Sequence, residues 1–284
     1  MVAGNNLSAS VGTAVGARIL SRQWAKALGA VGIVVGFVVQ GSSMHHTVRA
    51  IFPAGSDLVA TEALVVTVVA FLGAKALRAP LSLSMALVSL LVGFSTSNHL
   101  PIDYAYASTV IVMWVVAPII SLVFGFVFLK IIDKARPKNM WGRIREYKAL
   151  LVACSFLGGF ALGANTIGLI VALGGFDPLG VTLGALAIIL GCMFLSEGEI
   201  KRVGQDMFSL RYSNALASLL VSTILVEFAT FLAVPLSSTQ TLSAGVLGAG
   251  AAYRHKLFSL RPFLIIAAAW VIVPALSFLM GYLL

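Results

Sequence analysis

Charged residues are scarce in this chain. Asp, Glu, Lys and Arg make up 10% of its 284 residues, whereas about 25% is usual for a soluble domain. So few charges cannot cover a globular surface, which excludes a soluble enzyme, a nucleic-acid-binding domain and a disordered chain. Cysteine is also rare. Cys154 and Cys192 both lie in apolar stretches, which excludes a secreted disulfide scaffold.

Hydrophobic residues are abundant instead. They make up 60% of the chain, and the mean hydropathy is +1.02. Long apolar stretches lack the alternation that a membrane β-barrel needs, so the sequence predicts an all-α polytopic protein in a lipid bilayer. The ten stretches that we expect to be membrane segments are Leu7–Leu20, Trp24–Met44, Asp57–Leu77, Pro80–Ser97, Thr109–Leu129, Ala149–Gly174, Pro178–Leu195, Ser213–Val234, Pro235–Ala252 and Phe263–Leu284.

The net charge of +9 is explained by membrane topology. We suppose that the basic loop 130–148 is cytoplasmic and that each stretch crosses once. Of the 19 Lys and Arg residues, only Arg49 then lies outside the cytoplasmic loops, as the positive-inside rule requires. The sequence therefore predicts a multi-pass protein of the plasma membrane with its C-terminus outside. Because the basic residues set topology, no nucleic-acid partner is expected.

The chain contains an internal repeat. The Pro-Leu-Ser tripeptide at 80–82 recurs at 235–237, and the Trp-x-x-x-Pro pattern at 114–118 recurs at 270–274. Each copy has five membrane segments, an odd number, so the two copies are predicted to be inverted relative to each other. Inverted repeats are typical of secondary transporters, whose substrate sites lie at the membrane midplane between the copies.

This repeat divides the chain into a first transmembrane repeat (1–130), a basic cytoplasmic linker (131–148) and a second, inverted repeat (149–284). The distribution of basic residues fixes only on which side each loop lies. It leaves open whether the segments at 80–97 and 235–252 are hairpins or single crossings. The first copy lacks a counterpart of the apolar run that opens the second. Its stretch Leu7–Leu20 forms a helix of about 21 Å, against a hydrocarbon core of about 30 Å. We expect about 15 further residues of a first half-helix upstream; the alternative is a true late start with a partial first helix.

Two kinds of segment place polar residues beside helix-breaking glycine or proline inside the membrane: one begins at Gly4 and recurs at Gly163, and the other is the Pro-Leu-Ser segment. Hydroxyls and amides near a helix start, together with free N–H groups and the positive dipole end, form an anion site. The alternative is that they hold helices together. The predicted anion-binding residues are Asn5, Asn6, Ser8, Ser82, Ser84, Asn165, Thr166, Ser237, Ser238, Thr239 and Gln240.

With these segments the sequence resembles the PiT family, the inorganic phosphate transporters and related sulfate permeases. The family carries a Gly-Ala-Asn-Asp-x-x-Asn-Ala motif in each half, which residues 163–165 resemble here. It also carries Pro-x-Ser-Thr-Thr-His, which residues 235–240 resemble. The resemblance covers nearly the whole chain in both repeats. It implies inverted repeats, coupling of transport to Na⁺ or H⁺, and a homodimer.

The chain departs from the family pattern at its titratable positions. Asn6 and Thr166 replace the motif Asp, and Met85 and Gln240 replace the motif His. Hydrogen phosphate carries an O–H that benefits from an acceptor such as Asp, whereas sulfate needs only donors, and a carboxylate facing sulfate would repel it. We therefore favour sulfate as the substrate of a secondary transporter that works by alternating access.

Two acidic residues remain within the predicted spans, Glu62 and Glu227. A carboxylate inside the membrane is a functional candidate by default, so both are candidates for carrying a coupling proton. No catalytic residue, metal site or cofactor is predicted, because no Cys/His or His/Glu cluster lies at membrane depth. The alternatives are phosphate symport driven by Na⁺ or H⁺ and, from another class, an anion channel or a non-transporting sensor.

Overall fold

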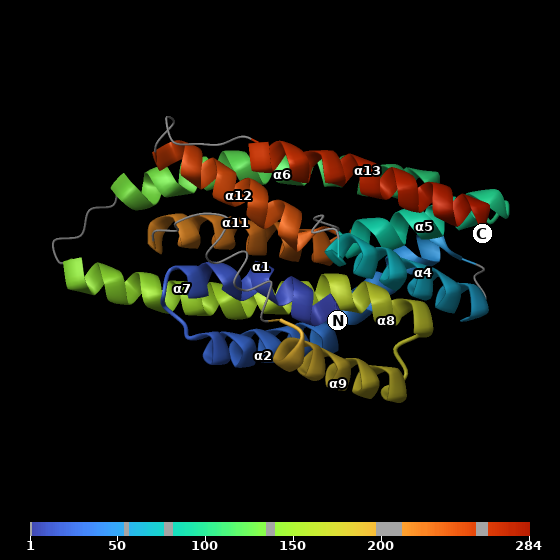
Figure 1. Ribbon diagram of the computed structural model, residues 1–284, viewed down its shortest axis with the longest axis horizontal. Helices are drawn as coiled ribbons and strands as arrows, with labels where there is room; N and C mark the ends of the chain where they lie inside the picture. The colour runs from blue at the N-terminus through green and yellow to red at the C-terminus, as the bar shows by residue number, and fades with distance from the viewer. Residues whose placement is uncertain (1, 54–56, 77–81, 135–139, 197–211, 254–260) are drawn as a thin grey trace.

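The computed structural model describes residues 2–53, 57–76, 82–134, 140–196, 212–253 and 261–284, and the regular structure in these ranges is helical (Figure 1). The elements are α1 (Val2–Gly16), α2 (Arg22–Gln40), the 3₁₀ turn η1 (Gly41–Met44), α3 (His45–Ile51), α4 (Asp57–Ala76), α5 (Leu83–Ser97), α6 (Tyr104–Lys134), α7 (Met140–Leu162), the π-helical turn η2 (Gly163–Ile167), α8 (Gly168–Gly174), α9 (Pro178–Phe194), α11 (Tyr212–Phe231), α12 (Ser238–Tyr253) and α13 (Arg261–Leu283).

The helices present an apolar surface to their surroundings. Large hydrophobic side chains are more than half exposed on several of them, among them Val65 of α4, Val115 of α6, Leu186 of α9 and Val271 of α13. Exposure of such an apolar surface to water is unfavourable, whereas contact with the hydrocarbon chains of lipid carries no such cost. Within the described residues, four segments are long and apolar enough to cross a membrane: Arg22–Ile51, Tyr104–Lys134, Ile144–Gly174 and Tyr212–Phe231.

Helices α4 and α5, and likewise α11 and α12, form two hairpins. Helices α5 and α12 both begin in the middle of the molecule and run from there toward its opposite ends (Figure 1). α5 has 15 residues and α12 has 16. Helices of that length reach about 22–24 Å, which is less than the hydrocarbon core of about 30 Å.

The two hairpins fit the alternative that the sequence left open for segments 80–97 and 235–252, and the expectation that every apolar stretch crosses once stays a prediction. A hairpin that enters and leaves on the same side adds no net crossing. If both hairpins do so, each copy has three crossings, which is still an odd number, and the inverted relation of the copies stays a prediction. Lys75 and Arg78 were expected in a cytoplasmic loop, and their side chains lie outside the described residues.

Two glycine crossings tie the halves of the chain together. α5 packs along α13, and α12 packs along α6, so each half packs its short hairpin helix against the other half. A Cβ on Gly281 would lie 1.9 Å from a carbonyl oxygen of α5, and one on Gly248 would lie 1.9 Å from a carbonyl oxygen of α6. The facing helices α5 and α6 carry Gly93 and Gly125. These two glycines stand at the repeat positions equivalent to Gly248 and Gly281. In lipid, such close approach by small residues is a main source of helix association.

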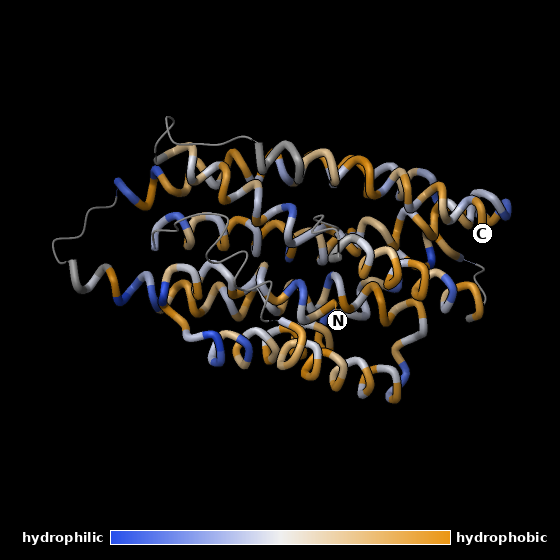
Figure 2. The backbone as a smooth tube through the Cα atoms, in the orientation of Figure 1, coloured by the Kyte–Doolittle hydropathy of each residue, from blue (hydrophilic) through white to orange (hydrophobic). Residues whose placement is uncertain are grey.

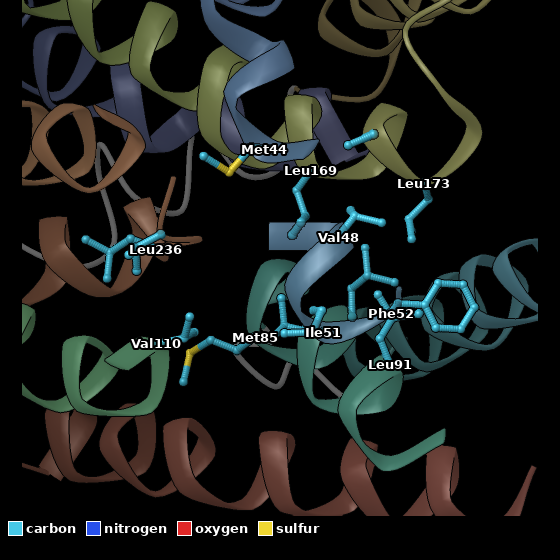
Figure 3. Close-up of a cluster of buried hydrophobic side chains, with 14 of the residues drawn as sticks. Met44, Val48, Ile51, Phe52, Met85, Leu91, Val110, Leu169, Leu173 and Leu236 are labelled. Atoms are coloured by element: carbon cyan, nitrogen blue, oxygen red, sulfur yellow. The ribbon is translucent and has the colours of Figure 1, made fainter. Parts of the chain in front are cut away.

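The largest hydrophobic core cluster surrounds the starts of α5 and α12. It includes Met85 of α5, Val110 of α6, Leu169 of α8 and Leu236 just before α12 (Figure 3). The cluster thus packs elements of both halves around the middle of the molecule. It fixes the starts of α5 and α12 relative to α6 and α8.

One end of the molecule carries much of the basic charge. The α1–α2 turn, the end of α6 and the start of α7 lie at this end (Figure 1), where hydrophilic positions gather (Figure 2). These elements include Arg18, Arg22, Lys134 and Lys148. The arrangement supports the assignment of this end to the cytoplasm, which stays a prediction.

Gly281→Ala tests the crossing of α5 and α13. The new methyl group has no space beside the α5 carbonyl, so the two backbones must separate. We expect a loss of stability of about 1–3 kcal/mol, measured as a thermal midpoint in detergent that is lower by several degrees. Gly73→Ala is the matched control, because its Cβ would meet no atom within 4 Å. Equal midpoints for the two variants would contradict the close crossing.

Candidate functional site

The connection between α11 and α12, residues 232–237, lies at a hairpin tip in the middle of the molecule. Its first part is a helix end: Ala233 N–H donates to the carbonyl of Thr230, and Val234 N–H donates to that of Ala229. Ala233 has a φ of 55°, the left-handed conformation with which helices commonly end. The carbonyls of Ala233, Val234 and Pro235 receive no helical bond, so they need other partners.

Asn165 of η2 forms hydrogen bonds with the backbone in the middle of this connection. Its Nδ2 donates to the Val234 carbonyl at 2.9 Å and to the Thr230 hydroxyl at 3.0 Å, and its Oδ1 accepts from Leu236 N–H at 2.9 Å. Both amide hydrogens are used, so Asn165 has no donor left for an anion in this conformation. In this structure Asn165 positions the backbone that leads into α12, and its role in binding an anion stays a prediction.

Side chains from the first half of the chain donate hydrogen bonds to the two other carbonyls of the same connection. Trp114 Nε1 donates to the Pro235 carbonyl at 2.9 Å, and the hydroxyls of Thr47 and Tyr106 both donate to the Ala233 carbonyl. Sequence reasoning did not assign these three residues to the site. Only the repeated Trp-x-x-x-Pro pattern at 114–118 pointed to one of them.

The start of α12 is capped from within. Ser237 Oγ accepts from Gln240 N–H at 3.3 Å and lies 3.1 Å from Thr239 Oγ1. This is an N-cap, which satisfies one of the four N–H groups left over at a helix start. The buried Oγ of Ser238 has no hydrogen-bond partner. Ser238 is therefore the hydroxyl at this helix start that remains available to a ligand.

The start of α5 is organised differently. Ser82 occupies the N-cap position with extended backbone, but its side chain makes no capping bond. Its Oγ lies 3.4 Å from Ser84 Oγ, and both residues are buried. The first N–H groups of α5 therefore lack the side-chain cap that α12 has, and two buried hydroxyls lie next to them. Pro80 and Leu81 lie outside the described residues.

The two helix starts contribute to one core cluster and border one cavity. Met85 of α5 and Leu236 before α12 belong to one core cluster, and Met85 and Gln240 line one cavity. Two helix N-termini thus approach the middle of the molecule from opposite directions (Figure 1). Their dipoles and N–H groups together favour a negative charge between them.

The remaining predicted residues lie in α1 and η2. Asn6 and Ser8 are buried in α1, and Asn5 is half-buried. Ser8 Oγ donates to the Asn5 carbonyl of its own helix at 3.1 Å, which is a local bond. Thr166 is buried in η2. α1 packs against α7, α11 and α12, which places these residues beside the second hairpin.

The two candidate carboxylates lie in different surroundings. Glu227 of α11 is half-buried, receives a hydrogen bond from the Gln40 side chain, and keeps Oε2 without a partner. Glu62 of α4 is exposed on the outer surface. Glu227 therefore stands against α2 within the bundle, whereas Glu62 faces outward.

Asn165→Leu tests the support of the hairpin tip. The substitution leaves the buried Val234 carbonyl and Leu236 N–H unpaired, and each such group costs about 1–3 kcal/mol. We expect a clearly lower thermal midpoint for purified protein. Asn98→Leu is the control, because Asn98 makes one exposed bond to its own helix and should shift the midpoint little. A midpoint for Asn165→Leu within the range of this control would refute the support role.

Comparison with known proteins gives consistent matches. The model of the phosphate transporter family matches residues 2–150 and 135–281. The chain is 22% identical to a putative phosphate permease of Methanocaldococcus jannaschii, over 99% of this chain and 91% of that protein. It is 25% identical to the sulfate permease CysP of Bacillus subtilis, over 100% of this chain and 83% of that protein.

Two further matches agree with these. A probable low-affinity inorganic phosphate transporter of Bacillus subtilis is 24% identical, over 71% of this chain and 66% of that protein. A solved structure described as the sodium-dependent phosphate transporter has the same fold, with a TM-score of 0.87 at 17% identity, over 99% of this chain and 94% of that one. The family match spans both halves of the helical bundle, and the chain belongs to the phosphate transporter family, a family of multi-pass membrane transport proteins.

Proposed function

We propose that this protein is a secondary active transporter for an inorganic tetrahedral oxyanion, with sulfate favoured, and that the anion binds between the starts of α5 and α12. The observation that carries the proposal is that two helices begin in the middle of the molecule, one without a side-chain cap and each with a buried hydroxyl at its start. A dianion there would accept hydrogen bonds from Ser82, Ser84 and Ser238 and from the first backbone N–H groups of both helices.

The preference for sulfate comes from the chemistry of these donors. Neither segment 82–85 nor segment 237–240 contains Asp, Glu or His, and Asn165 Oδ1 is already bonded to Leu236 N–H. Hydrogen phosphate brings one O–H that needs an acceptor, whereas sulfate brings acceptors only. The full-length similarity to a protein named as a sulfate permease also supports this choice.

Alternating access would follow from the way the halves are joined. Each short hairpin helix packs against a helix of the other half, so movement of one bundle against the other would open the middle of the molecule to one side at a time. Phosphate symport is the second candidate, because two of the similar proteins are named as phosphate transporters. An anion channel is disfavoured, because the polar residues gather at the helix breaks and form no continuous polar stripe along one helix.

Uptake into proteoliposomes tests the proposal. We expect labelled sulfate to enter under an inward proton gradient, with unlabelled phosphate competing weakly, because the donors match an anion that carries no proton. A parallel series with a sodium gradient or no gradient identifies the driving ion. Phosphate uptake driven by Na⁺, with sulfate a poor competitor, would refute the preference and support the symport alternative.

The same assay locates the site. In Ser82→Ala and Ser238→Ala we expect the KM for sulfate to rise about tenfold or more, since each removes a hydrogen bond to a charged group, worth about 1.5–3 kcal/mol. Neither hydroxyl is needed for a cap, so folding should be little affected. Ser108→Ala is the control, because Ser108 bonds to the Ala105 carbonyl at an exposed position. Unchanged KM values in both site variants would move the site elsewhere.

We further propose that Glu227 carries the coupling proton. It is a half-buried carboxylate inside the bundle with one oxygen unpaired, as a group that binds and releases a proton requires. In Glu227→Gln we expect sulfate uptake to lose its response to an imposed pH gradient, while exchange of sulfate at equal pH continues. Glu62→Gln should leave the response intact, because Glu62 faces outward. A normal pH response in Glu227→Gln would exclude this role.

A further inference from the structure

Three buried hydroxyl residues meet where α12 packs against α6 and α11: Ser121 of α6, Ser222 of α11 and Thr241 of α12. Each is at most 3% exposed. Ser222 Oγ lies 2.7 Å from Thr241 Oγ1, and Ser121 Oγ donates to the Thr241 carbonyl at 2.6 Å. Thr241 is therefore bonded to both neighbouring helices, to one through its side chain and to the other through its backbone.

The Thr241 hydroxyl also reaches back to the first turn of its own helix. It donates to the Ser238 carbonyl at 3.1 Å and lies 3.3 Å from the Ser237 carbonyl. Ser222 Oγ lies 3.4 Å from the same Ser238 carbonyl. A hydroxyl has one hydrogen, so both hydrogens are used when Ser222 donates to Thr241 and Thr241 donates to Ser238. The bonds then run from α11 through Thr241 to the start of α12.

A glycine one turn further along α12 makes room for these contacts. A Cβ on Gly245 would lie 3.1 Å from Ser121 Oγ and 3.2 Å from the Ser218 carbonyl. Without a side chain at this position, α6 and α11 both approach α12 closely. The hydroxyls of Ser121 and Ser222 can then reach Thr241 from two sides.

The first half of the chain lacks this arrangement. When the two Pro-Leu-Ser segments are aligned, Thr241 corresponds to Ala86 and Ser222 corresponds to Thr67. Ala86 has no hydroxyl, and Thr67 Oγ1 is buried without a hydrogen-bond partner. The connection from the neighbouring helix to the helix start is thus formed in the second half and interrupted in the first, and the residue that makes the difference is Thr241.

We propose that Thr241 is a positioning residue for the anion site, which holds the first turn of α12 in place relative to α6 and α11. The inference rests on the proposed function, because it concerns a helix start at which the anion would bind. Thr241 does not contact the anion, since its hydroxyl is fully buried and bonds within the protein. A helix start that is already held in place need not be ordered when the anion binds.

Kinetics of sulfate uptake into proteoliposomes test this role. Thr241→Val keeps the size of the side chain and removes the hydroxyl. We expect the KM to rise about three- to tenfold, the range that one hydrogen bond gives, while the maximal rate changes by less than about twofold. Thr241→Ser keeps the hydroxyl and should restore the parent KM. Thr96→Val is the matched control, because the Thr96 hydroxyl bonds within its own helix.

Ser222→Ala removes the same connection without changing α12. It should raise the KM in the parent protein and have no further effect in a Thr241→Val background, because both changes break one path. If Thr241→Val does not fold, Ser222→Ala and Thr241→Ser test the role without it. Thermal midpoints of all variants identify losses that come from stability alone.

Three results would overturn the proposal. An unchanged KM in Thr241→Val or in Ser222→Ala, with a lower thermal midpoint, would make these bonds purely structural. Equal KM increases in Thr241→Val and Thr241→Ser would assign the effect to the methyl group. A full effect of Ser222→Ala in the Thr241→Val background would separate the two residues. Failure of the proposed site gives a different result, because the KM would then be unchanged in Ser82→Ala and Ser238→Ala as well.

Discussion

A backbone that leaves a helix inside a membrane must find every hydrogen bond within the protein, because lipid offers none. The α11–α12 connection is where this constraint acts most strongly. Its three carbonyls and one N–H are satisfied by Asn165, Trp114, Thr47 and Tyr106, which come from three different elements. The hairpin tip can therefore exist only when α3, α6 and η2 are already in place around it.

The same constraint explains why helix starts are useful here. A helix that begins in the middle of a membrane exposes up to four N–H groups to a medium without acceptors. Ser237 satisfies one of them for α12, but Ser82 does not do so for α5. An anion is the natural partner for what remains. In the proposed transporter, the binding of the anion and the stability of the hairpin are thus two aspects of one unpaired set of donors.

The sequence predicted some of this arrangement because its signals are local. Pro-Leu-Ser marks a helix start by its own chemistry, and α5 and α12 do begin at Leu83 and Ser238. The partners of Asn165 lie 65 to 71 residues away, and no local pattern distinguishes an amide that binds an anion from one that binds a distant backbone. The sequence could not decide between hairpins and single crossings for a similar reason. Hydropathy counts apolar residues and does not report the direction in which the chain turns.

The two hairpins are related by the repeat but differ in how firmly they are held. The second is held by hydrogen bonds from α3, α6 and η2. In addition, Gln240 Nε2 donates to the Trp114 carbonyl of α6, which has no helical partner because Pro118 lacks an N–H. The equivalent of Gln240 in the first half is Met85, which has no N–H to donate, so the first half cannot form this link through that position. The bond between Ser237 and Thr239 in the second hairpin is also shorter than that between Ser82 and Ser84 in the first. The second tip is therefore held more firmly, and in the proposed transporter the hydroxyls that can turn toward the anion lie mainly at the start of α5.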